Sequence, residues 1–389
     1  MNHLQNSSLK VIGYWMSEKK SQKLNWSEFA KVCRVHGFEL VKLDLTRSLE
    51  DQGPFNVIIH KLTDIIAQAL KGDVKSMKML GYVEDYIKSH PEVVIIDPLE
   101  NVRKLLDRYI SYRVIHDSDL DKIDVFTPPF VELLSSDVDT NLRTLQEAGV
   151  TFPFVCKPSV ANGTDCHKMA VVFNERGLKD CQPPCVAHSF VNHNAVLYKL
   201  FIVGDEYHIV ERPSLKNFYA DPDRATIHFH SHDVSKSDSS SSLSVLDENE
   251  CGMNPREGRA ADPDLLRQIV SIIRAELGMS LLGVDVVTEN TTGRHAVIDI
   301  NPYPGYDGYP NFFESLVRCI ERSINEKEIT TTITADRKNS KDSEKLLATS
   351  PIFPGDQDHD SGFETADSSD EKKRSPALVG TGKSHERHL

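Results

Sequence analysis

The sequence contains no long hydrophobic run. Its longest apolar stretches, such as residues 93–96 (VVII), have the length of a β-strand, whereas a membrane-spanning helix needs about 20 consecutive apolar residues. No apolar segment near the N-terminus precedes a small-residue cleavage site, so no secretory signal is indicated. The sequence therefore predicts neither secretion nor membrane insertion, and we expect a cytoplasmic protein without a membrane partner.

Paired cysteine motifs are also missing. The chain has seven cysteines, an odd number, and none belongs to a Cys-x-x-Cys pair. This usage is typical of free thiols in a reducing compartment. Cys181 and Cys185 are the nearest two, but no matching Cys/His pair has the spacing of a zinc ligand set, so a zinc site is not expected.

Net positive charge is absent as well. With 45 Lys and Arg residues against 58 Asp and Glu residues, the formal net charge is −13. This balance argues against a broad nucleic-acid-binding surface, and no nucleic-acid partner is expected. Any polyanion must then be held by a local cluster of basic side chains, which makes the positions of individual Lys, Arg and His residues informative. The 389 residues suffice for two or three domains.

The first part of the chain alternates short apolar runs with helical stretches. Asn25 is the expected N-cap of one helix, with Glu28 at the capping-box position. The expected strands cover residues 10–15, 38–43, 56–60 and 93–96, and one long helical stretch covers 64–89. This alternation predicts a doubly wound parallel α/β domain over residues 1–98. Such sheets bind ligands at the carboxyl ends of their strands, where Lys20 and Lys61 fall. No Gly-x-Gly-x-x-Gly follows the first strand, which argues against a dinucleotide site.

Beyond residue 98 the pattern changes. We expect a central α+β subdomain over residues 99–190, a C-terminal α+β subdomain over 191–327, and a disordered Ser/Asp/Lys-rich tail over 328–389. Helices are expected at residues 100–114, 139–148, 264–277 and 312–323. Strands are expected at residues 152–158, 169–173 and 185–191.

Residues 195–213 form a predicted hairpin, because Gly204-Asp205 suits a two-residue II′ turn. In that register Leu197 lies opposite Arg212, and Lys199 shares their face. Two cations on one face of a sheet can be merely solvated, or they can bridge a phosphate group. The hairpin alone leaves both interpretations open.

A second predicted hairpin, at residues 283–305, carries oxygen ligands. Two β-branched runs flank the Asn-Thr-Thr-Gly sequence at 290–293, which is a hairpin signal. With the turn centred there, Asp285 falls opposite Asp299, and Asn301 shares the face of Asp299. Like charges directly opposite each other are destabilising unless a cation neutralises them, and hard oxygen ligands favour Mg²⁺ over Zn²⁺. The alternative is two acidic residues on a solvated strand face.

The order of these features resembles the ATP-grasp superfamily, in which two α+β subdomains clamp ATP. Lys157 lies on a strand behind a Gly-containing loop, a strand at residues 188–191 follows, and the carboxylate hairpin comes last. A closer resemblance is to the inositol-tetrakisphosphate 1-kinase family, also described as the inositol-trisphosphate 5/6-kinase family. The segments that carry it are, in order, GYWMSEKK (13–20), IIHKLTD (58–64), LLDRYISY (105–112), FPFVCKP (152–158), HNAVLYK (193–199), ERPSLKNF (211–218) and VIDINPYPGYDG (297–308).

The resemblance implies a set of residues for each ligand. ATP, the co-substrate, is expected to contact Arg108, Lys157, His188, Val191, Lys199, Ser214, Ser231 and Ser235. Residues 188–199 are expected to line its adenine pocket. Two Mg²⁺ ions are expected at Asp285, Asp299 and Asn301. The inositol polyphosphate is expected to be bound by Lys20, Lys61, His167, Lys199, Arg212, Asn301 and Gly305. The catalytic roles are expected to fall to Lys199 and Asp299.

Two positions depart from the family pattern. His188 stands where the family has glutamine, which leaves open how the adenine edge is recognised, and Asn162 stands where it has histidine. His167 can also be an ordinary loop histidine, and the cysteines at 156, 166 and 185 are interpreted as packing residues. No carboxylate base for the substrate hydroxyl can be chosen, and a loose transition state hardly requires one.

The resemblance thus implies a monomeric, Mg²⁺-dependent ATP-grasp kinase that phosphorylates inositol polyphosphates. The implied substrates are inositol 3,4,5,6-tetrakisphosphate at position 1 and inositol 1,3,4-trisphosphate at position 5 or 6. The family is also credited with moving phosphate between inositol phosphates through bound nucleotide. Two alternatives remain. A carboxylate–amine ligase of the same fold would not need Lys20, Lys61, Lys199 and Arg212 together. A non-catalytic nucleotide-binding module would not need to retain Lys157 and all the metal ligands.

Overall fold

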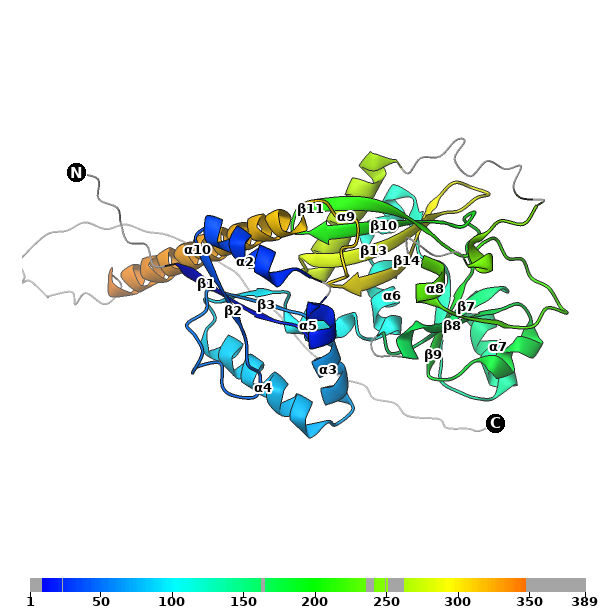
Figure 1. Ribbon diagram of the computed structural model, residues 1–389, viewed down its shortest axis with the longest axis horizontal. Coiled ribbons are helices and arrows are strands. Elements are labelled where there is room, and N and C mark those ends of the chain that lie inside the picture. Colours follow the sequence, from blue (N-terminus) through cyan, green and yellow to red (C-terminus); the bar gives the residue numbers. More distant parts are fainter. Residues whose placement is uncertain are drawn as a thin grey trace, which may run out of the picture. The chain divides into compact units, whose positions relative to one another are not determined.

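The computed structural model describes residues 9–22, 24–161, 165–235, 241–248, 250 and 262–347 (Figure 1). Side chains are described up to residue 333, except those of residues 19 and 165. The chain divides into two compact units, Met1–Ala335 and Asp336–Leu389, and all three sheets belong to the first. Most of the tail expected over 328–389, and the family departure at Asn162, lie outside the described residues.

The N-terminal part is a four-stranded parallel sheet, as predicted. The strands run in the order β2-β1-β3-β4, and every neighbouring pair is parallel. Their bounds are β1 Lys10–Trp15, β2 Phe38–Lys42, β3 Val57–His60 and β4 Val94–Ile96. Helix α2 (Trp26–Val35) begins as expected, because the Asn25 side chain accepts a hydrogen bond from the Glu28 N–H group.

Helices cover both faces of this sheet (Figure 1). One face packs on α3 (Thr63–Leu70) and α4 (Val74–Ser89), in a core that includes Ile58 and Leu80. The other face packs on α2 and on the start of α10 (Phe312–Leu347), in a core that joins Ile59, Phe29 and Leu316. The doubly wound arrangement is therefore confirmed for this sheet.

Two predicted helices are each broken into two, so these predictions were wrong. Residues 64–89 form α3 and α4, separated at Gly72, whose φ of +87° ends one helix before Asp73 caps the next. Residues 100–114 form α5 (Leu99–Lys104) and α6 (Arg108–His116), because Asp107 accepts a hydrogen bond from Ile110 N–H and starts a new helix. This second break places Arg108 at the first position of α6.

The central sheet is antiparallel, with strand order β12-β8-β7-β9-β6. Its strands are β6 Phe130–Leu133, β7 Phe154–Pro158, β8 Lys168–Val172, β9 Cys185–Ser189 and β12 Ile227–His230. Helix α7 (Val138–Glu147) packs on one face of the sheet through Leu145, which shares a core with Phe154 and Ala187.

The C-terminal sheet has the order β11-β10-β13-β14-β5, and only the β14–β5 pair is parallel. Its strands are β5 Val125–Phe126, β10 Val196–Val203, β11 Glu206–Pro213, β13 Leu281–Thr288 and β14 His295–Pro302. Helix α9 (Pro263–Leu277) and helix α6 share one core with Val284 of this sheet.

Two edge strands come from distant parts of the chain. Strand β5 lies in the range expected for the central subdomain but pairs with β14. Strand β12 lies in the range expected for the C-terminal subdomain but pairs with β8. Helix α10 also continues well beyond the helix expected at 312–323. The remaining short helices are α1 Glu18–Ser21, α8 Ser231–Ser235 and the 3₁₀ segments Asp119–Ile123, Asp165–His167, Glu175–Asp180 and Ser242–Ser244.

A buried carboxylate joins the parallel sheet to the C-terminal sheet. Asp97, which follows β4, accepts hydrogen bonds from the backbone N–H groups of Ser280 (2.6 Å) and Leu281 (2.9 Å). Its carbonyl oxygen lies 2.7 Å from His60 Nε2. Burial raises the pKa of Asp97 to about 6, although the two N–H groups act in the opposite direction. Burial likewise lowers the pKa of His60 to about 4.

Candidate active site

The carboxylate hairpin forms as predicted, with an irregularity that the sequence did not reveal. Asp285 of β13 pairs with Asp299 of β14, but the register shifts at the next pair, where Val286 lies opposite Val297. Ile298 is therefore a bulged residue without a cross-strand partner. Its carbonyl oxygen instead accepts hydrogen bonds from the Tyr112 hydroxyl (2.6 Å) and the Lys157 ammonium (3.1 Å).

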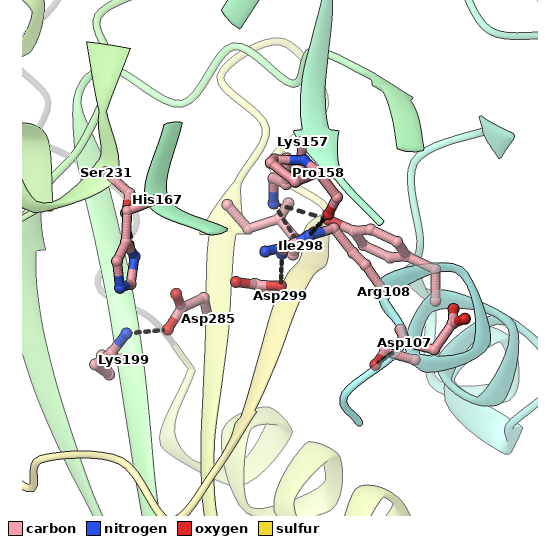
Figure 2. A network of polar contacts seen from close by, with 12 residues as sticks. Asp107, Arg108, Lys157, Pro158, His167, Lys199, Ser231, Asp285, Ile298 and Asp299 are labelled. Atoms are coloured by element: carbon pink, nitrogen blue, oxygen red, sulfur yellow. Dashed lines mark hydrogen bonds and ion pairs between the residues drawn. The ribbon is translucent and has the colours of Figure 1, made fainter. Parts of the chain in front are cut away.

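Four charged side chains lie in a row across three neighbouring strands and one helix. Lys199 of β10 pairs with Asp285, which in turn pairs with Asp299. Lys199 Nζ is 2.6 Å from Asp285 Oδ1, and Arg108 Nη1 is 2.9 Å from Asp299 Oδ1. Figure 2 shows these two ion pairs on opposite sides of the paired aspartates. The row carries two positive and two negative charges, and its members are at most one-fifth exposed.

The two carboxylates are electrostatically different. Burial, together with the neighbouring Asp299, raises the pKa of Asp285, although Lys199 opposes the shift. Burial acts on Asp299 in the same direction, but the combined charges of Lys157, Arg108 and Lys199 outweigh it and lower the pKa of Asp299. Asp299 is therefore ionised at neutral pH and is a poor proton acceptor.

Lys157 is buried at the end of β7 and lies beside this row. Its ammonium group donates to the Tyr112 hydroxyl oxygen (2.8 Å) and to the Ile298 carbonyl oxygen. Burial lowers the pKa of Lys157 to about 8, while the charge of Asp299 favours the protonated form. The amine therefore remains mostly protonated at pH 7.

A cavity runs from this charged row between the central and C-terminal sheets. Eight of the residues predicted for ATP or metal contact line it: Lys157, His188, Val191, Ser214, Ser231, Ser235, Asp285 and Asp299. Its apolar lining includes Phe190 and Leu197, which fall in the range predicted for the adenine pocket, and four residues that were not predicted: Met169, Leu215, Phe229 and Val287. Apolar walls with a few convergent polar groups are typical of a small-molecule site.

Two buried histidines belong to the polar part of the cavity wall. His193 makes two hydrogen bonds: its Nδ1–H donates to the Val191 carbonyl oxygen (2.6 Å), and its Nε2 accepts from the Ser214 hydroxyl (2.7 Å). His188 Nδ1 is 3.1 Å from the Ser189 carbonyl oxygen, and its Nε2 has no hydrogen-bond partner within the described part of the chain. Burial lowers the pKa of both rings, that of His193 to about 4.

The predicted substrate cations lie outside this cavity, on side chains held by nearby acceptors. Lys20 Nζ is 3.0 Å from Asp64 Oδ2 and 3.2 Å from the Thr63 hydroxyl. Lys61 donates to the Tyr303 carbonyl oxygen, and Arg212 Nη2 lies 2.5 Å from the carbonyl oxygen of residue 307. Lys61 and Arg212 thus both contact the loop that contains the exposed Gly305. The predicted pairing of Leu197 with Arg212 is confirmed.

His167 lies on the Ser231 side of the site (Figure 2). Its Nδ1 atom is 3.2 Å from the Ser231 hydroxyl, and its ring centroid is 3.8 Å from that of His232. Burial and the neighbouring His232 lower the pKa of His167 to about 4. Burial raises the pKa of the neighbouring Cys166 thiol, although the charges of Arg108 and Lys20 act in the opposite direction.

The donor set of the row fits Mg²⁺. Two carboxylates face each other across the hairpin, and the Asn301 amide follows on the same strand, so all three ligands are hard oxygens. Among the described residues no three His, Cys, Asp or Glu side chains form a metal cluster; the predicted set consists of two carboxylates and one amide. The six described cysteines are free and buried, in agreement with the prediction of reduced thiols.

Two residues that the sequence analysis missed hold predicted ones in place. Tyr112 lies one helical turn after Arg108 in α6 and contacts Lys157. Asp64 lies in the first turn of α3 and contacts Lys20. Helical spacing of four residues was a usable signal for Tyr112, since positions i and i+4 share a face. Asp64 lies three residues after Lys61, at the end of the segment 58–64, but its partner is distant in sequence.

Family models match most of the chain. A model described as the inositol 1,3,4-trisphosphate 5/6-kinase pre-ATP-grasp domain matches residues 11–102, and one described as the inositol 1,3,4-trisphosphate 5/6-kinase ATP-grasp domain matches residues 119–322. Inositol-tetrakisphosphate 1-kinase of Xenopus laevis is 49% identical over 80% of this chain and 78% of its own length. The protein of that name from Danio rerio is 48% identical over the same shares. Inositol-tetrakisphosphate 1-kinase 3 of Glycine max is 30% identical over 78% of this chain and 81% of its own.

Solved structures with similar folds are ATP-grasp proteins. D-alanine–D-alanine ligase from Bacillus anthracis in complex with ATP aligns with a TM-score of 0.50 over 83% of this chain and all of its own, at 15% identity. D-cycloserine synthetase DcsG aligns with a TM-score of 0.53 over 81% of this chain and 99% of its own, also at 15% identity. These similarities show the fold. No described helix combines the length and hydropathy that a membrane crossing requires.

Proposed function

Because this chain belongs to the inositol 1,3,4-trisphosphate 5/6-kinase family, we propose that it transfers the γ-phosphoryl group of ATP to a hydroxyl of an inositol polyphosphate with the help of two Mg²⁺ ions. The proposed substrates are inositol 3,4,5,6-tetrakisphosphate at position 1 and inositol 1,3,4-trisphosphate at position 5 or 6. Phosphate movement between inositol phosphates through bound nucleotide is part of the same proposal. So are action as a monomer and location in the cytoplasm.

The observation that carries the proposal is the charged row beside the cavity. An apolar cavity of the ATP-grasp fold ends at two paired carboxylates, and Lys199 of β10 and Arg108 of α6 contact these carboxylates. A nucleotide in the cavity would bring its phosphates to the carboxylates. A polyphosphorylated acceptor would lie on the other side, among cations that a carboxylate substrate would not require.

Different residues of the site would bind the metal ions, bind the nucleotide phosphates and exclude water. Asp285, Asp299 and Asn301 would hold Mg²⁺, which neutralises charge on phosphate oxygens and orients them. Lys157 and Arg108 would bind nucleotide phosphates, and the apolar walls would exclude water from the base. Lys199, which contacts Asp285 at one end of the row, would lie between the nucleotide and the acceptor. In a loose transition state, positioning and charge neutralisation supply most of the rate, so the low pKa of Asp299 is compatible with catalysis.

The acceptor side is formed by Lys20, Lys61, Arg212, His167 and Gly305. The three cationic side chains already lie against oxygen acceptors of the chain, which keeps them extended in place. His167 is neutral at pH 7 in the absence of a ligand and can donate a hydrogen bond. Gly305 has no side chain and would allow a phosphate to approach the backbone closely.

The test is incubation with ATP, Mg²⁺ and a panel of inositol phosphate isomers, followed by separation of the products by charge. We expect one added phosphate on the two proposed substrates and loss of that activity in the Asp299→Asn variant. Unchanged turnover in this variant would remove the metal role. ATP consumption that requires an amine and a carboxylic acid would instead favour a ligase, the activity named for one of the two structural neighbours.

A further inference from the structure

The Tyr112 side chain lies where α6, β7 and β14 meet, and nothing in the proposed reaction has given it a role. It is 1% exposed, and its ring packs beside Phe130 and His188. Burial raises the pKa of its hydroxyl well above the usual value, so the group stays protonated. The hydroxyl donates its proton to the Ile298 carbonyl oxygen and accepts a hydrogen bond from Lys157.

The hydrogen bond to Tyr112 limits the number of N–H donors that Lys157 has left. An ammonium group has three N–H donors and no acceptor. One donor is used by the Tyr112 oxygen at 2.8 Å and a second by the Ile298 carbonyl oxygen at 3.1 Å. The hydroxyl has already donated its single proton to Ile298, so toward Lys157 it acts only as an acceptor. One N–H of the ammonium is left, on a side chain that lines the cavity.

We propose that Tyr112 is the positioning residue of Lys157, holding its ammonium group so that a single N–H is presented to a nucleotide phosphate oxygen. This inference rests on the proposed function, since it assumes that Lys157 binds ATP. The ring supports the same orientation, with the ammonium 5.5 Å from its centroid. Lys157 lines the same cavity as Asp285 and Asp299, the carboxylates that would hold Mg²⁺. A nucleotide phosphate bound there would therefore accept the remaining N–H of Lys157.

The flexible stem explains why Lys157 needs such a partner. A lysine side chain has many rotamers and loses entropy when it is held in one of them, and the charge of Asp299 attracts this ammonium group. Without the hydroxyl, Lys157 would be free to turn toward Asp299 and occupy a carboxylate that the metal requires. The Tyr112 hydroxyl oxygen and the Ile298 carbonyl oxygen hold the ammonium group away from Asp299. Because both oxygens are neutral, they do not cancel its positive charge.

The same helix fixes a second cation. Arg108 and Tyr112 are four residues apart in α6 and therefore share a face. Arg108 contacts Asp299 directly, whereas Tyr112 acts through Lys157 and the bulged Ile298. Helix α6 thus sets the placement of both cations that are assigned to nucleotide phosphates. The Asp107 cap, which sets where α6 begins, consequently also sets the positions of Arg108 and Tyr112 in the site.

The test compares Tyr112→Phe with a matched control, Tyr86→Phe. Both tyrosines are buried, and each hydroxyl bonds a backbone group, but Tyr86 accepts from Phe55 N–H in the N-terminal part. Loss of a hydrogen bond to a charged group corresponds to roughly a 10- to 100-fold change in an equilibrium constant. We expect Tyr112→Phe to raise the Kd and KM for ATP by about that factor, with the KM for the inositol phosphate unchanged. The control should lower thermal stability and leave both constants unchanged.

A double-mutant cycle separates positioning from a general structural role. In a Lys157→Met background the Tyr112→Phe change should have no further effect on ATP affinity, because Tyr112 acts through Lys157. An equal loss in both backgrounds would overturn the inference, as would wild-type ATP affinity in Tyr112→Phe. If Tyr112→Phe does not fold, 3,5-difluorotyrosine at this position keeps the size and weakens the acceptor, and it should weaken ATP binding in the same direction. Failure of the wild-type protein to bind ATP would instead refute the proposed function.

Discussion

Replacing Lys199 with methionine should tighten the binding of a divalent cation to the protein without ligands. Lys199 neutralises Asp285 in the charged row, with its ammonium nitrogen 2.6 Å from Oδ1. A metal ion that binds between Asp285 and Asp299 must displace this contact, and the same holds for Arg108 on the other aspartate. Methionine has a similar length and no charge, so it removes the competitor and leaves the two carboxylates to repel each other.

The magnitude follows from the strength of the contact that the metal has to break. A hydrogen bond to a charged group contributes about 1.5–3 kcal/mol net, and about 1.4 kcal/mol corresponds to a tenfold change in affinity. We therefore expect the Kd for Mn²⁺, used as a paramagnetic substitute for Mg²⁺, to fall roughly 10- to 150-fold in Lys199→Met. The displaced ammonium group becomes available to an anion in the wild-type protein only. A phosphate ligand should therefore strengthen Mn²⁺ binding in the wild type and have a smaller effect in the variant.

Free Mn²⁺ can be measured by its electron paramagnetic resonance signal during titration of the apoprotein. Lys199→Arg retains the charge and should bind Mn²⁺ as the wild type does. Lys122→Met is a matched control, because Lys122 forms a lysine–aspartate pair with Asp119 on the exposed surface. Unchanged or weaker Mn²⁺ binding in Lys199→Met, while Asp285→Asn abolishes it, would refute the reasoning. Absence of Mn²⁺ binding in every protein would refute the metal site itself.

Three further predictions concern stability. Because burial lowers the pKa of His193 to about 4, the stability that comes from its neutral ring is complete above its unfolded pKa of about 6.5 and is lost as the pH falls toward 4. The unfolding free energy in urea should then drop by about 2 kcal/mol more between pH 7 and pH 5 in the wild type than in His193→Gln, and equal slopes would contradict this. Asp97→Ala leaves the two buried N–H groups of residues 280–281 without their acceptor and should cost about 2 kcal/mol; an unchanged denaturation midpoint would show that water replaces it. Gly283→Ala would place a Cβ atom 3.0 Å from Pro304 Cγ, and we expect about 1–3 kcal/mol of destabilisation, together with a higher KM for the inositol phosphate.

The parts of the fold that sequence reasoning predicted depend on local signals. The Asn25 cap, the four parallel strands and the turn at Gly204 are each specified by a few neighbouring residues. The pairing of Asp285 with Asp299 was also reached from the turn and the period of two. The hairpin contains a bulge that the prediction lacked, yet the predicted pair is still correct. The turn itself is centred slightly before the predicted position, and the extra residue Ile298 makes up the difference.

The parts that escaped prediction depend on contacts between distant residues. No local signal shows that residues 125–126 pair with β14 or that β12 pairs with β8, since an edge strand is chosen by the sheet that has room for it. The helix breaks at Gly72 and Asp107 were readable from their turn and cap residues but were outweighed by the surrounding helical pattern. The bulge at Ile298 is set by the hydroxyl and ammonium groups that bind its carbonyl oxygen.

For the candidate site, the sequence indicated charged residues that lie together, but it did not indicate most of the apolar residues and hydrogen-bond partners around them. Lys157, His188 and the two aspartates line one cavity, as the resemblance implied. The remaining apolar wall residues, such as Met169 and Leu215, were missed because they are indistinguishable from core residues until the sheets are placed. Partners such as Asp64 were missed because a side chain that holds a ligand-binding residue carries no motif of its own.

The exchange of edge strands between the two larger sheets has a consequence for how the protein can be divided. A cut between β9 and β10 would leave the N-terminal piece with β5 but without β12, and the C-terminal piece with β12 but without β5. The N-terminal piece would therefore leave β8 without its edge strand β12, and the C-terminal piece would leave β14 without its edge strand β5. Each piece would contain the strand that the other piece lacks. We expect neither piece to remain dispersed alone, and the two to recover a native assembly when they are refolded together.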